Sequence, residues 1–337
     1  MRMKVFIAGG SGLIGRAIVS RLVARGDEPI ILSRRADEVR RDPSLRSLRF
    51  VQGDPTVAGE WASSIDGCDA VINLAGFNLF DKRWNVSVKQ AIRDSRVLAT
   101  EKLVAAVKQA RQRPKVFVQG SAIGYYGPQG DEELTESSPS GSDFMSVVCR
   151  EWEEAAKPAE DLIARVATIR TGVVLAKEAG ALAVMTPIFK WLPGGAAPVG
   201  SGGKFAPASG LQWMSWIHLD DIAGLFLLGL DHPEAVGPIN GTSPNPVRNV
   251  DFSRALAQVV KRPFLPFGLP DAILTLLLGE VADVVAKGQK VMPSRAAALG
   301  YLFKYPVLME ALAAVFAPPP KAAAKPAVHP HATAPHH

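Results

Sequence analysis

The sequence predicts an α/β protein with a doubly wound parallel sheet, followed by a smaller C-terminal domain. Apolar runs of strand length alternate with longer segments in which apolar residues recur every three or four positions. This alternation ends near residue 178, beyond which turns rich in proline and glycine separate shorter helical pieces. A βαβ alternation places neighbouring strands in parallel and covers both faces of the sheet with helices.

The apolar runs expected to be strands are Lys4–Ala8, Glu28–Leu32, Leu48–Gln52, Ala70–Ala75, Lys115–Gly120 and Val166–Leu175. Helical spacing is clearest in Gly15–Arg25, Val86–Gln112 and Phe144–Lys157. Residues 1–178 would form the main domain, to which strands from about 211–245 could return, and residues 179–316 mostly a C-terminal region. Residues 317–337 form a Pro/Ala/His-rich tail too poor in large apolar groups to pack, so we expect disorder there.

Composition narrows the classes of partner. The net charge of +6 comes from basic residues scattered among acidic ones, so nucleic acid is not an expected partner. Apolar runs such as Ile222–Leu230 fall short of the roughly 18 residues that span a membrane, and no membrane contact is expected. Cys68 and Cys149 lie far apart in sequence, which favours a reduced, cytoplasmic protein over a disulfide framework.

No metal site is expected. Four of the six histidines lie in the tail, where no carboxylate or thiolate accompanies them, so they make no defined ligand set.

A glycine-rich turn directly follows the first expected strand and precedes a helix. It reads Gly9-Gly10-Ser11-Gly12-Leu13-Ile14-Gly15. Gly9 permits the tight turn, Gly12 lets the backbone approach a pyrophosphate, and Gly15 allows close packing of helix on strand. The helix N-terminus supplies amides and a positive dipole to the phosphates. The turn predicts a Rossmann-type dinucleotide-binding domain over residues 1–178, with cofactor contacts from Gly9, Ser11, Gly12, Leu13, Ile14 and Gly15.

The end of the second strand indicates which dinucleotide is bound. An NAD site usually has an acid there for the ribose 2′-hydroxyl, whereas this chain reads Ser33-Arg34-Arg35. A hydroxyl and a guanidinium suit a 2′-phosphate, because Arg binds phosphate through paired charge-assisted hydrogen bonds. We expect NADP(H), with NAD(H) disfavoured. The alternative is that both arginines are merely solvated at a strand end.

Several separated motifs resemble, in order, those of the extended short-chain dehydrogenases/reductases. They are Gly53-Asp54, Asn73–Gly76 (NLAG), Asp81–Trp84 (DKRW), Ser121–Gly127 (SAIGYYG), Arg170–Leu175 (RTGVVL), Trp216–Asp221 (WIHLDD) and Asn245–Asn249 (NPVRN). More specifically, they resemble the NAD(P)-dependent epimerase/dehydratase-like subfamily once described as a cell-division inhibitor. The C-terminal domain of that subfamily, of unknown function, resembles Gly279-Glu280, Gly288-Gln289 and Pro293 here.

The resemblance implies roles for particular residues. Gly53 and Asp54 would lie at the cofactor, with Asp54 meeting the adenine, while Leu74, Ala75 and Gly76 would line the cofactor. Ser121 would take the place of the catalytic serine beside the nicotinamide.

The chemistry of Ser121 and its neighbours is compatible with that role. Ser121 could hydrogen-bond a substrate carbonyl or hydroxyl, and Tyr125 or Tyr126 could offer a phenol at nearly the same place. The alternative for these side chains is polar packing at a strand end.

The Tyr and Lys that usually transfer the proton in this superfamily are missing. Phe144 and Val148 stand where the Tyr and the Lys would be. Proton transfer would then fall to Tyr125, Cys149 or His218. Cys149 at helical spacing is more typical of a buried apolar residue, and His218 could equally fix the chain through a local hydrogen bond.

The substrate side is defined by fewer residues. Arg170, after the sixth strand, could bind a substrate phosphate or carboxylate, and an internal salt bridge is the alternative. His218 is the second candidate substrate residue. Phe77 departs from the subfamily pattern, which has Glu after Asn-Leu-Ala-Gly.

Two functions remain in view from the sequence. The first is an NADP(H)-dependent oxidoreductase or epimerase acting on a nucleotide sugar or another small hydroxyl or carbonyl compound. The second is a catalytically weak or inactive NADP(H)-binding regulatory protein, connected to cell division in older descriptions of the subfamily. A small molecule is the expected partner, and the helices at 86–112 and 144–157 would also allow a homodimer.

Overall fold

The computed structural model describes residues 2–43, 45–177, 209–265, 279–281 and 287–317, together with 182, 183, 186 and 268. The turn-rich sequence after residue 186 and nearly all of the predicted tail, with its histidines, lie outside the described residues.

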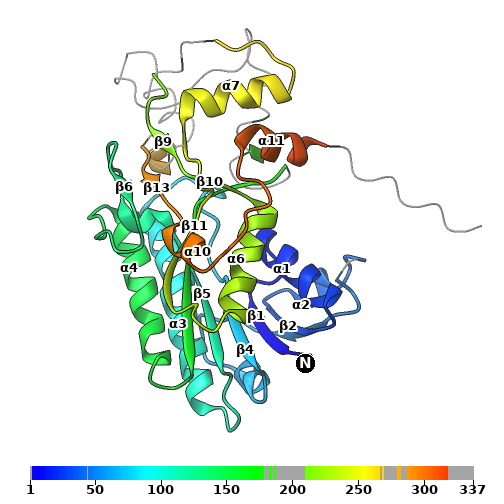
Figure 1. Cartoon of the computed structure of the whole chain (residues 1–337). Coiled ribbons are helices and arrows are strands. Elements are labelled where there is room, and N and C mark those ends of the chain that lie inside the picture. Colours follow the sequence, from blue (N-terminus) through cyan, green and yellow to red (C-terminus); the bar gives the residue numbers. More distant parts are fainter. Residues whose placement is uncertain are drawn as a thin grey trace, which may run out of the picture.

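A seven-stranded sheet forms the centre of the molecule, with the order β11-β7-β5-β4-β1-β2-β3 (Figure 1). Every neighbouring pair in it is parallel. The strands are β1 Lys4–Ala8, β2 Glu28–Ser33, β3 Arg49–Gln52, β4 Ala70–Asn73, β5 Val116–Ala122, β7 Arg165–Thr171 and β11 Gly237–Gly241. The predicted Rossmann-type α/β fold is therefore confirmed, and β11 is a strand that returns from the 211–245 stretch.

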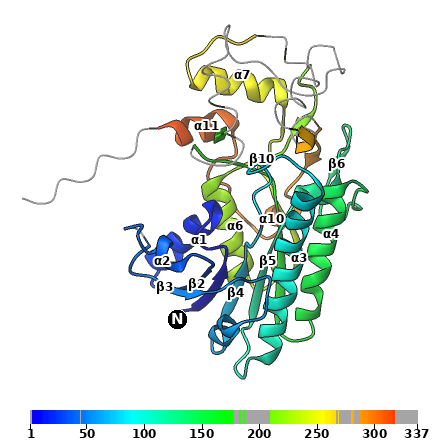
Figure 2. The same ribbon diagram turned by 180° about the vertical axis from the view of Figure 1, so that it is seen from behind.

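Alternating side chains of the central strands supply two separate cores. Val5 and Ile7 of β1 belong to one cluster, while Phe6 and Ala8 belong to the other. This is the alternation that a strand buried on both faces requires. Helix α3, Val86–Gln109, packs on the face of Phe6 and also contacts α4, Phe144–Ala156. Figures 1 and 2 show these two helices side by side on one face of the sheet.

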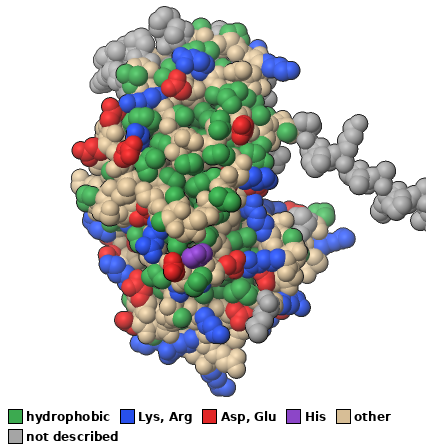
Figure 3. Space-filling view, viewed as in Figure 1, with side chains coloured by type: hydrophobic (Ala, Val, Ile, Leu, Met, Phe, Trp, Pro, Cys, Tyr) green, Lys and Arg blue, Asp and Glu red, His purple; other side chains and the backbone are tan. Residues whose placement is uncertain are grey.

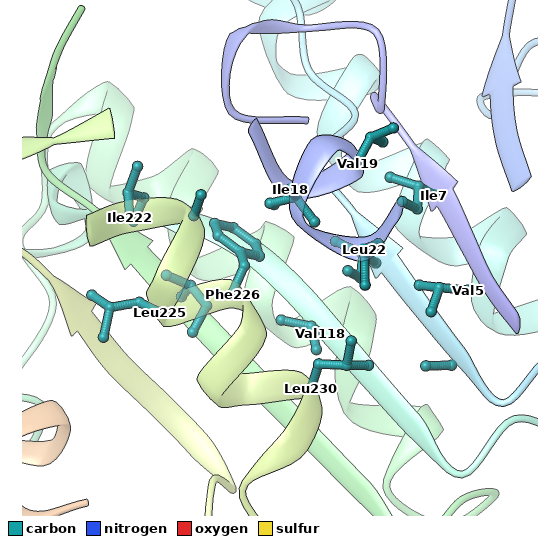
Figure 4. Packing of buried hydrophobic residues seen from close by; sticks show 14 of the residues in the cluster. Val5, Ile7, Ile18, Val19, Leu22, Val118, Ile222, Leu225, Phe226 and Leu230 are labelled. Carbon is teal, nitrogen blue, oxygen red and sulfur yellow. The ribbon is translucent and has the colours of Figure 1, made fainter. Parts of the chain in front are cut away.

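The opposite face is covered by α1, Leu13–Ala24, and α6, Leu219–Asp231, which contact each other. Figure 4 shows Ile18 and Leu22 of α1 and Phe226 of α6 gathered over the strands. Shorter elements lie in the connections, and η1 and η3 contact α3 while η2 contacts α4. They are α2 Ala36–Val39, η1 Glu60–Ile65, η2 Ile123–Tyr126 and η3 Lys157–Ala159.

Side-chain caps explain where the long helices begin. The Asn85 side chain accepts a hydrogen bond from the Val88 amide at 2.9 Å, and Asp143 accepts one from the Ser146 amide at 2.8 Å. Each cap satisfies an amide of the first turn that has no partner within the helix.

The predicted strand at 166–175 is divided. It ends at Thr171 in β7 and resumes as β8, Val173–Leu175, which pairs with β10, Trp216–His218, in a separate sheet. A Cβ on Gly172 would lie 2.6 Å from the Ser215 carbonyl oxygen. The break therefore lies where another backbone segment passes too close for any side chain.

A smaller C-terminal region lies beyond the carboxyl ends of the sheet strands (Figure 1). Its core contains Trp216, Phe252 and Leu312. Its elements are β9 Trp213–Met214, β12 Val247–Arg248, α7 Asn249–Val259, η4 Gly279–Val281, β13 Lys290–Val291 and α11 Leu308–Phe316. The short helix α10, Ser294–Ala298, instead packs against β11 of the central sheet. The pairing of β13 with β6, Glu133–Leu134, ties this region to the main domain.

Acidic and basic side chains are interspersed on the face shown in Figure 3. Among the described residues, no helix combines the length and the apolar character needed to cross a membrane.

Asp221 joins α6 to the chain near the C-terminus. Its carboxylate is buried and accepts hydrogen bonds from the amides of Lys304 at 2.7 Å and Tyr305 at 2.9 Å. We predict that Asp221→Ala lowers the free energy of unfolding by about 3 kcal/mol, because buried donors to a charged group lose their acceptor. Urea denaturation measures this change.

Asp220 provides the matched control. It bonds Arg21 and Lys304 but keeps a third of its side chain exposed, so Asp220→Ala should change stability by no more than about 1 kcal/mol. Equal losses in the two variants would contradict the role assigned to Asp221.

Candidate functional site

The glycine turn after β1 has no room for larger residues at two positions. Gly9 has a φ of +81°, and a Cβ there would lie 2.6 Å from the Leu74 carbonyl oxygen. A Cβ on Gly15 would lie 2.3 Å from the Gly9 carbonyl oxygen. At Gly12, in contrast, the nearest described atom would be 3.3 Å away. The turn therefore packs tightly against the sheet and leaves Gly12, the N-cap of α1, open to a ligand.

Arg16 supports this turn, although no sequence pattern identified it as a site residue. Its Nε donates to the Ser11 carbonyl at 2.9 Å, and its guanidinium also pairs with Asp42. The carbonyl of Ser11 is thus held by a side chain one turn into α1, and Leu13 and Ile14 begin the helix.

Buried amides shape the segment after β4. Asn73 donates to Thr100 Oγ1 at 2.9 Å and to Gln119 Oε1 at 3.1 Å, and its own oxygen accepts from the Ala75 amide at 3.1 Å. Leu74, Ala75 and Gly76 therefore follow a path fixed by a side-chain network. The contact between Leu74 and Gly9 places this path beside the glycine turn.

Ser33, Arg34 and Arg35 form the turn at the end of β2. The Ser33 hydroxyl accepts from the Arg35 amide at 3.2 Å, while Gln52 donates to the Arg34 carbonyl at 2.5 Å. Gln52 pairs with Ser33 in the strand register, which is how a residue distant in sequence comes to hold this turn. The Arg35–Glu38 ion pair is exposed and so contributes little to stability.

Asp54 is anchored in a local turn. Its carboxylate accepts from the Thr56 amide at 2.9 Å and from the Thr56 hydroxyl at 2.7 Å. Gly53 lies against the Trp61 ring, where a Cβ would be 2.6 Å from Cδ1. The contact of Asp54 with adenine stays a prediction.

Ser121 is buried at the end of β5 and belongs to a chain of hydrogen bonds. Its hydroxyl donates to Glu153 Oε1 at 2.7 Å. Glu153 also receives two bonds from Arg170, from Nε and Nη2, both at 2.8 Å. Arg170 Nη1 then donates to the Tyr126 hydroxyl at 2.9 Å, and that hydroxyl donates to Asn240 at 2.7 Å. We call Ser121, Glu153, Arg170, Tyr126 and Asn240 the serine network.

Charge and burial set the protonation of this network. Burial alone would lower the pKa of Arg170, but the hydrogen bonds and charge of Glu153 outweigh it and raise that pKa above its usual value. Burial raises the pKa of Tyr126, against the opposing effect of Arg170. Tyr126 is therefore a neutral hydrogen-bonding group at neutral pH.

Arg170 is buried and bonded within the chain. Its side chain is 4% exposed, and its nitrogens bond Glu153, Tyr126 and the Glu136 carbonyl. The internal salt bridge with Glu153 is therefore present, and Arg170 holds that carboxylate in place. Binding of a substrate by Arg170 stays a prediction.

His218 also has a partner within the chain, and its contact with a substrate stays a prediction. Its Nδ1 accepts from the Asp220 amide at 3.0 Å and caps α6, and its ring centroid lies 4.0 Å from that of Tyr305. Burial lowers its pKa. The local hydrogen bond, considered as the alternative to proton transfer, is the one observed.

Tyr125 differs from these residues because it is only partly buried. Its ring centroid lies 3.5 Å from Cζ of Arg170, and the ring meets Tyr126 edge on. It thus borders the serine network without being an interior member.

Apolar packing occupies the positions of the missing Tyr and Lys. Phe144 and Val148 lie in a cluster with Val88 and Ile92 of α3, and Phe144 meets Trp84 edge on at 5.4 Å. The neighbouring Cys149 is buried, and burial raises the pKa of its thiol to about 12. A thiol that stays protonated cannot act as the general base.

The sequence did not identify Glu153 as a site residue. The signals available in the sequence were the Cys149–Glu153 segment (CREWE), which resembles the Cys-x-x-Trp-Glu of the subfamily, and the position of Glu153 four residues after Cys149, on the same face of α4. Its partner, Arg170, lies on a different element, strand β7. Throughout the described ranges, no group of His, Cys, Asp and Glu side chains could hold a metal ion.

A glycine turn between the first strand and first helix of a parallel sheet defines a Rossmann-type dinucleotide-binding protein. The chain belongs to the NAD dependent epimerase/dehydratase family, whose model matches residues 5–240. A second model, a domain of unknown function (DUF1731), matches residues 269–315. The latter range contains the C-terminal motifs at 279–280, 288–289 and 293, so the family resemblance is confirmed in both parts.

Relatives match along nearly the whole chain. The chloroplastic homolog of the epimerase family protein SDR39U1 from Arabidopsis thaliana is 41% identical over 320 residues, which cover 93% of this chain and 87% of that protein. The crystal structure of human SDR39U1 (isoform 2) with NADPH is 33% identical, with a TM-score of 0.80 over 93% of this chain and 99% of that one.

A nucleoside-diphosphate sugar epimerase from Corynebacterium glutamicum is 34% identical, with a TM-score of 0.70 over 93% of this chain and 58% of that one. Since one relative is chloroplastic, a cytoplasmic location stays a prediction for this chain.

The glycine turn can be tested by adding one methyl group. Gly15→Ala should weaken binding of NADPH about tenfold or more, because relieving such an overlap costs about 1–3 kcal/mol and shifts the turn. Fluorescence titration with NADPH measures the change. Gly130→Ala is the control, since a Cβ there meets nothing within 4 Å. Unchanged binding in Gly15→Ala would contradict the tight-turn account.

Proposed function

We propose that this protein is an NADP(H)-dependent oxidoreductase or epimerase of a small hydroxyl or carbonyl substrate. The observation that carries the proposal is the position of Ser121 at the carboxyl end of β5, held by Glu153. Ligands of open parallel sheets bind at this edge. Family membership and the relative crystallised with NADPH support the choice of cofactor.

The direction of the Ser121 hydrogen bond favours a hydroxyl group on the substrate. Glu153 accepts the Ser121 proton, so the free lone pairs of the serine oxygen can accept a hydrogen bond from a substrate alcohol. Bound NADP(H) supplies or accepts a hydride at the carbon that bears this oxygen. Ser121 would polarise and orient the reacting oxygen, with Arg170 fixing Glu153 behind it.

Tyr125 is the best remaining candidate for the proton transfer. Cys149 is buried with a raised pKa, and His218 is committed to capping α6. Tyr125 is partly exposed and adjoins the serine network through Arg170.

The alternative function is regulatory binding of NADP(H) without turnover. The apolar packing of Phe144 and Val148, where the usual Tyr and Lys would be, favours it. The two functions differ in turnover: the enzyme converts a substrate and requires Ser121 to do so, whereas the regulatory protein converts none.

Turnover is tested by following NADP(H) absorbance with simple alcohols and carbonyl compounds, and by following epimer formation with nucleotide sugars, because an epimerase consumes no NADPH overall. We expect Ser121→Ala to lower kcat about 100-fold, the usual effect of losing a group that acts on the reacting oxygen. Ser63→Ala, a serine in η1 that bonds only the Glu60 carbonyl, should keep full activity. Turnover that survives in Ser121→Ala would contradict the assigned role, and absence of turnover in the wild type would favour regulation.

Cofactor choice is tested separately at Arg34. Arg34→Ala should weaken NADPH about tenfold or more and NADH little, because only NADPH carries the 2′-phosphate. Arg41→Ala, which removes the same charge from an exposed position nearby, is the control. Equal losses for both cofactors in Arg34→Ala would show that Arg34 does not read the phosphate.

A further inference from the structure

Arg96 on α3 is a cation with few partners at the edge of the sheet that carries Ser121. Its Nη1 donates to the Ile92 carbonyl at 2.9 Å and its Nη2 to the Phe77 carbonyl at 3.1 Å. No carboxylate among the described residues forms a salt bridge with it. Two carbonyls leave most of its five N–H donors without an acceptor in the part of the chain that the structure describes.

The surroundings of Arg96 connect it to the candidate site. A Cβ on Gly76 would lie 3.2 Å from Arg96 Cζ, so the guanidinium adjoins the segment after β4. Gly76 is exposed and Arg96 partly so, which leaves this edge open to a ligand. On the other side, Arg96 Cζ lies 5.2 Å from the Trp152 ring centroid. Trp152 in turn touches Gly120, the residue before Ser121.

Trp152 supplies a second, independent observation. Its Nε1 is buried and lacks a hydrogen-bond partner within the described chain. The residue itself is 6% exposed. A donor that is buried without an acceptor, beside a cation that forms no salt bridge, both counted over the described residues, is a combination that folded proteins complete with a ligand, an ion or a water.

Other buried or partly buried arginines have either a carboxylate partner or several carbonyl acceptors at a helix end. Arg170 has Glu153, and Arg93, three positions before Arg96, has Glu151 at 2.6 Å. Arg165 has no carboxylate, but three carbonyls at the C-terminal end of α6 accept its hydrogen bonds within 2.8 Å. Those carbonyls carry the negative end of the helix dipole.

Burial affects the pKa of Arg96 but does not remove its charge. Burial lowers the pKa of Arg96, and this is the largest effect on it. A guanidinium nevertheless keeps its proton in proteins, so a positive charge remains at this edge.

We propose that Arg96 recognises a carboxylate or phosphate group of the substrate. The proposal rests on the proposed function, because it takes the edge near Gly76 and Ser121 to be the substrate side of a cofactor-binding site. A forked guanidinium binds such anions through paired hydrogen bonds, which also fix their orientation. The substrate class is thereby narrowed to anionic hydroxyl or carbonyl compounds.

Position 77 offers a way to block Arg96 without removing it. The Phe77 carbonyl accepts from Arg96, so position 77 lies beside the guanidinium, although the Phe77 ring packs against the apolar cluster of Val88 and Ile92. We expect the carboxylate of Phe77→Glu to leave that cluster and pair with Arg96, because an unpaired charge among apolar groups is costly. Phe77→Gln has the same length and no charge, so it is the matched control. Arg96→Gln removes the cation itself.

The experiment measures the melting temperature of the full chain with saturating NADPH while inorganic phosphate or acetate is added at constant ionic strength. A ligand that binds only the folded state raises the melting temperature. We expect both anions to protect the wild type and Phe77→Gln. In Arg96→Gln and Phe77→Glu, the apparent Kd for phosphate should rise about tenfold or more.

Equal protection of all four proteins, or of none, would overturn the proposal. So would protection of the wild type that disappears when NADPH is present, because the anion would then occupy a cofactor subsite. If Arg96→Gln does not fold, the comparison of Phe77→Glu with Phe77→Gln still decides. NADPH binding by each protein is measured in parallel, and its absence from the wild type would count against the proposed function instead.

Discussion

The buried ion pair between Glu153 and Arg170 is the interaction on which the candidate site depends. It joins α4 to β7, and through Ser121, Tyr126 and Asn240 it also reaches β5, η2 and β11. A buried charge that loses its partner destabilises a protein strongly, so each of the two groups requires the other. Their bidentate geometry fixes Glu153 and thereby the direction in which the Ser121 hydroxyl points.

This ion pair changes how the lost Tyr and Lys are understood. The face of α4 that would present them is packed with Phe144 and Val148 against α3, while the same helix presents Glu153 toward β5 and β7. The helix is therefore retained as a support for Ser121, although it no longer presents the usual acid and base. A site built in this way has a hydroxyl held at Ser121, a partly exposed phenol at Tyr125 and, at Arg96, a cation that forms no salt bridge with the described residues.

Much of the fold could be predicted from the sequence, because it follows from local patterns. Apolar runs and their spacing identified the strands and the helices α1, α3 and α4, and the glycine turn follows from steric demands that Gly9 and Gly15 show directly. The break between β7 and β8 could not be predicted. It depends on the approach of the Ser215 carbonyl to Gly172, a contact between segments that are distant in sequence.

The site was less predictable for the same reason. Arg170 and His218 were correctly identified as polar groups at strand ends, but only their partners, Glu153 and the Asp220 amide, show that they position other groups. Gln52 and Arg96 carry no motif of their own, and their importance arises from where β3 and α3 place them. The role of each polar side chain therefore depends on hydrogen-bond partners that only the folded chain brings next to it.

The central claim is that this chain binds NADP(H) at the glycine turn and distinguishes it from NAD(H). A calorimetric titration of the purified, cofactor-stripped protein with NADPH and with NADH tests it most directly. The account predicts one site per chain, with NADPH bound about tenfold or more tightly, as charge-assisted bonds to one phosphate would provide. Equal affinity for the two cofactors would contradict the selectivity, and failure to bind either would contradict the account as a whole.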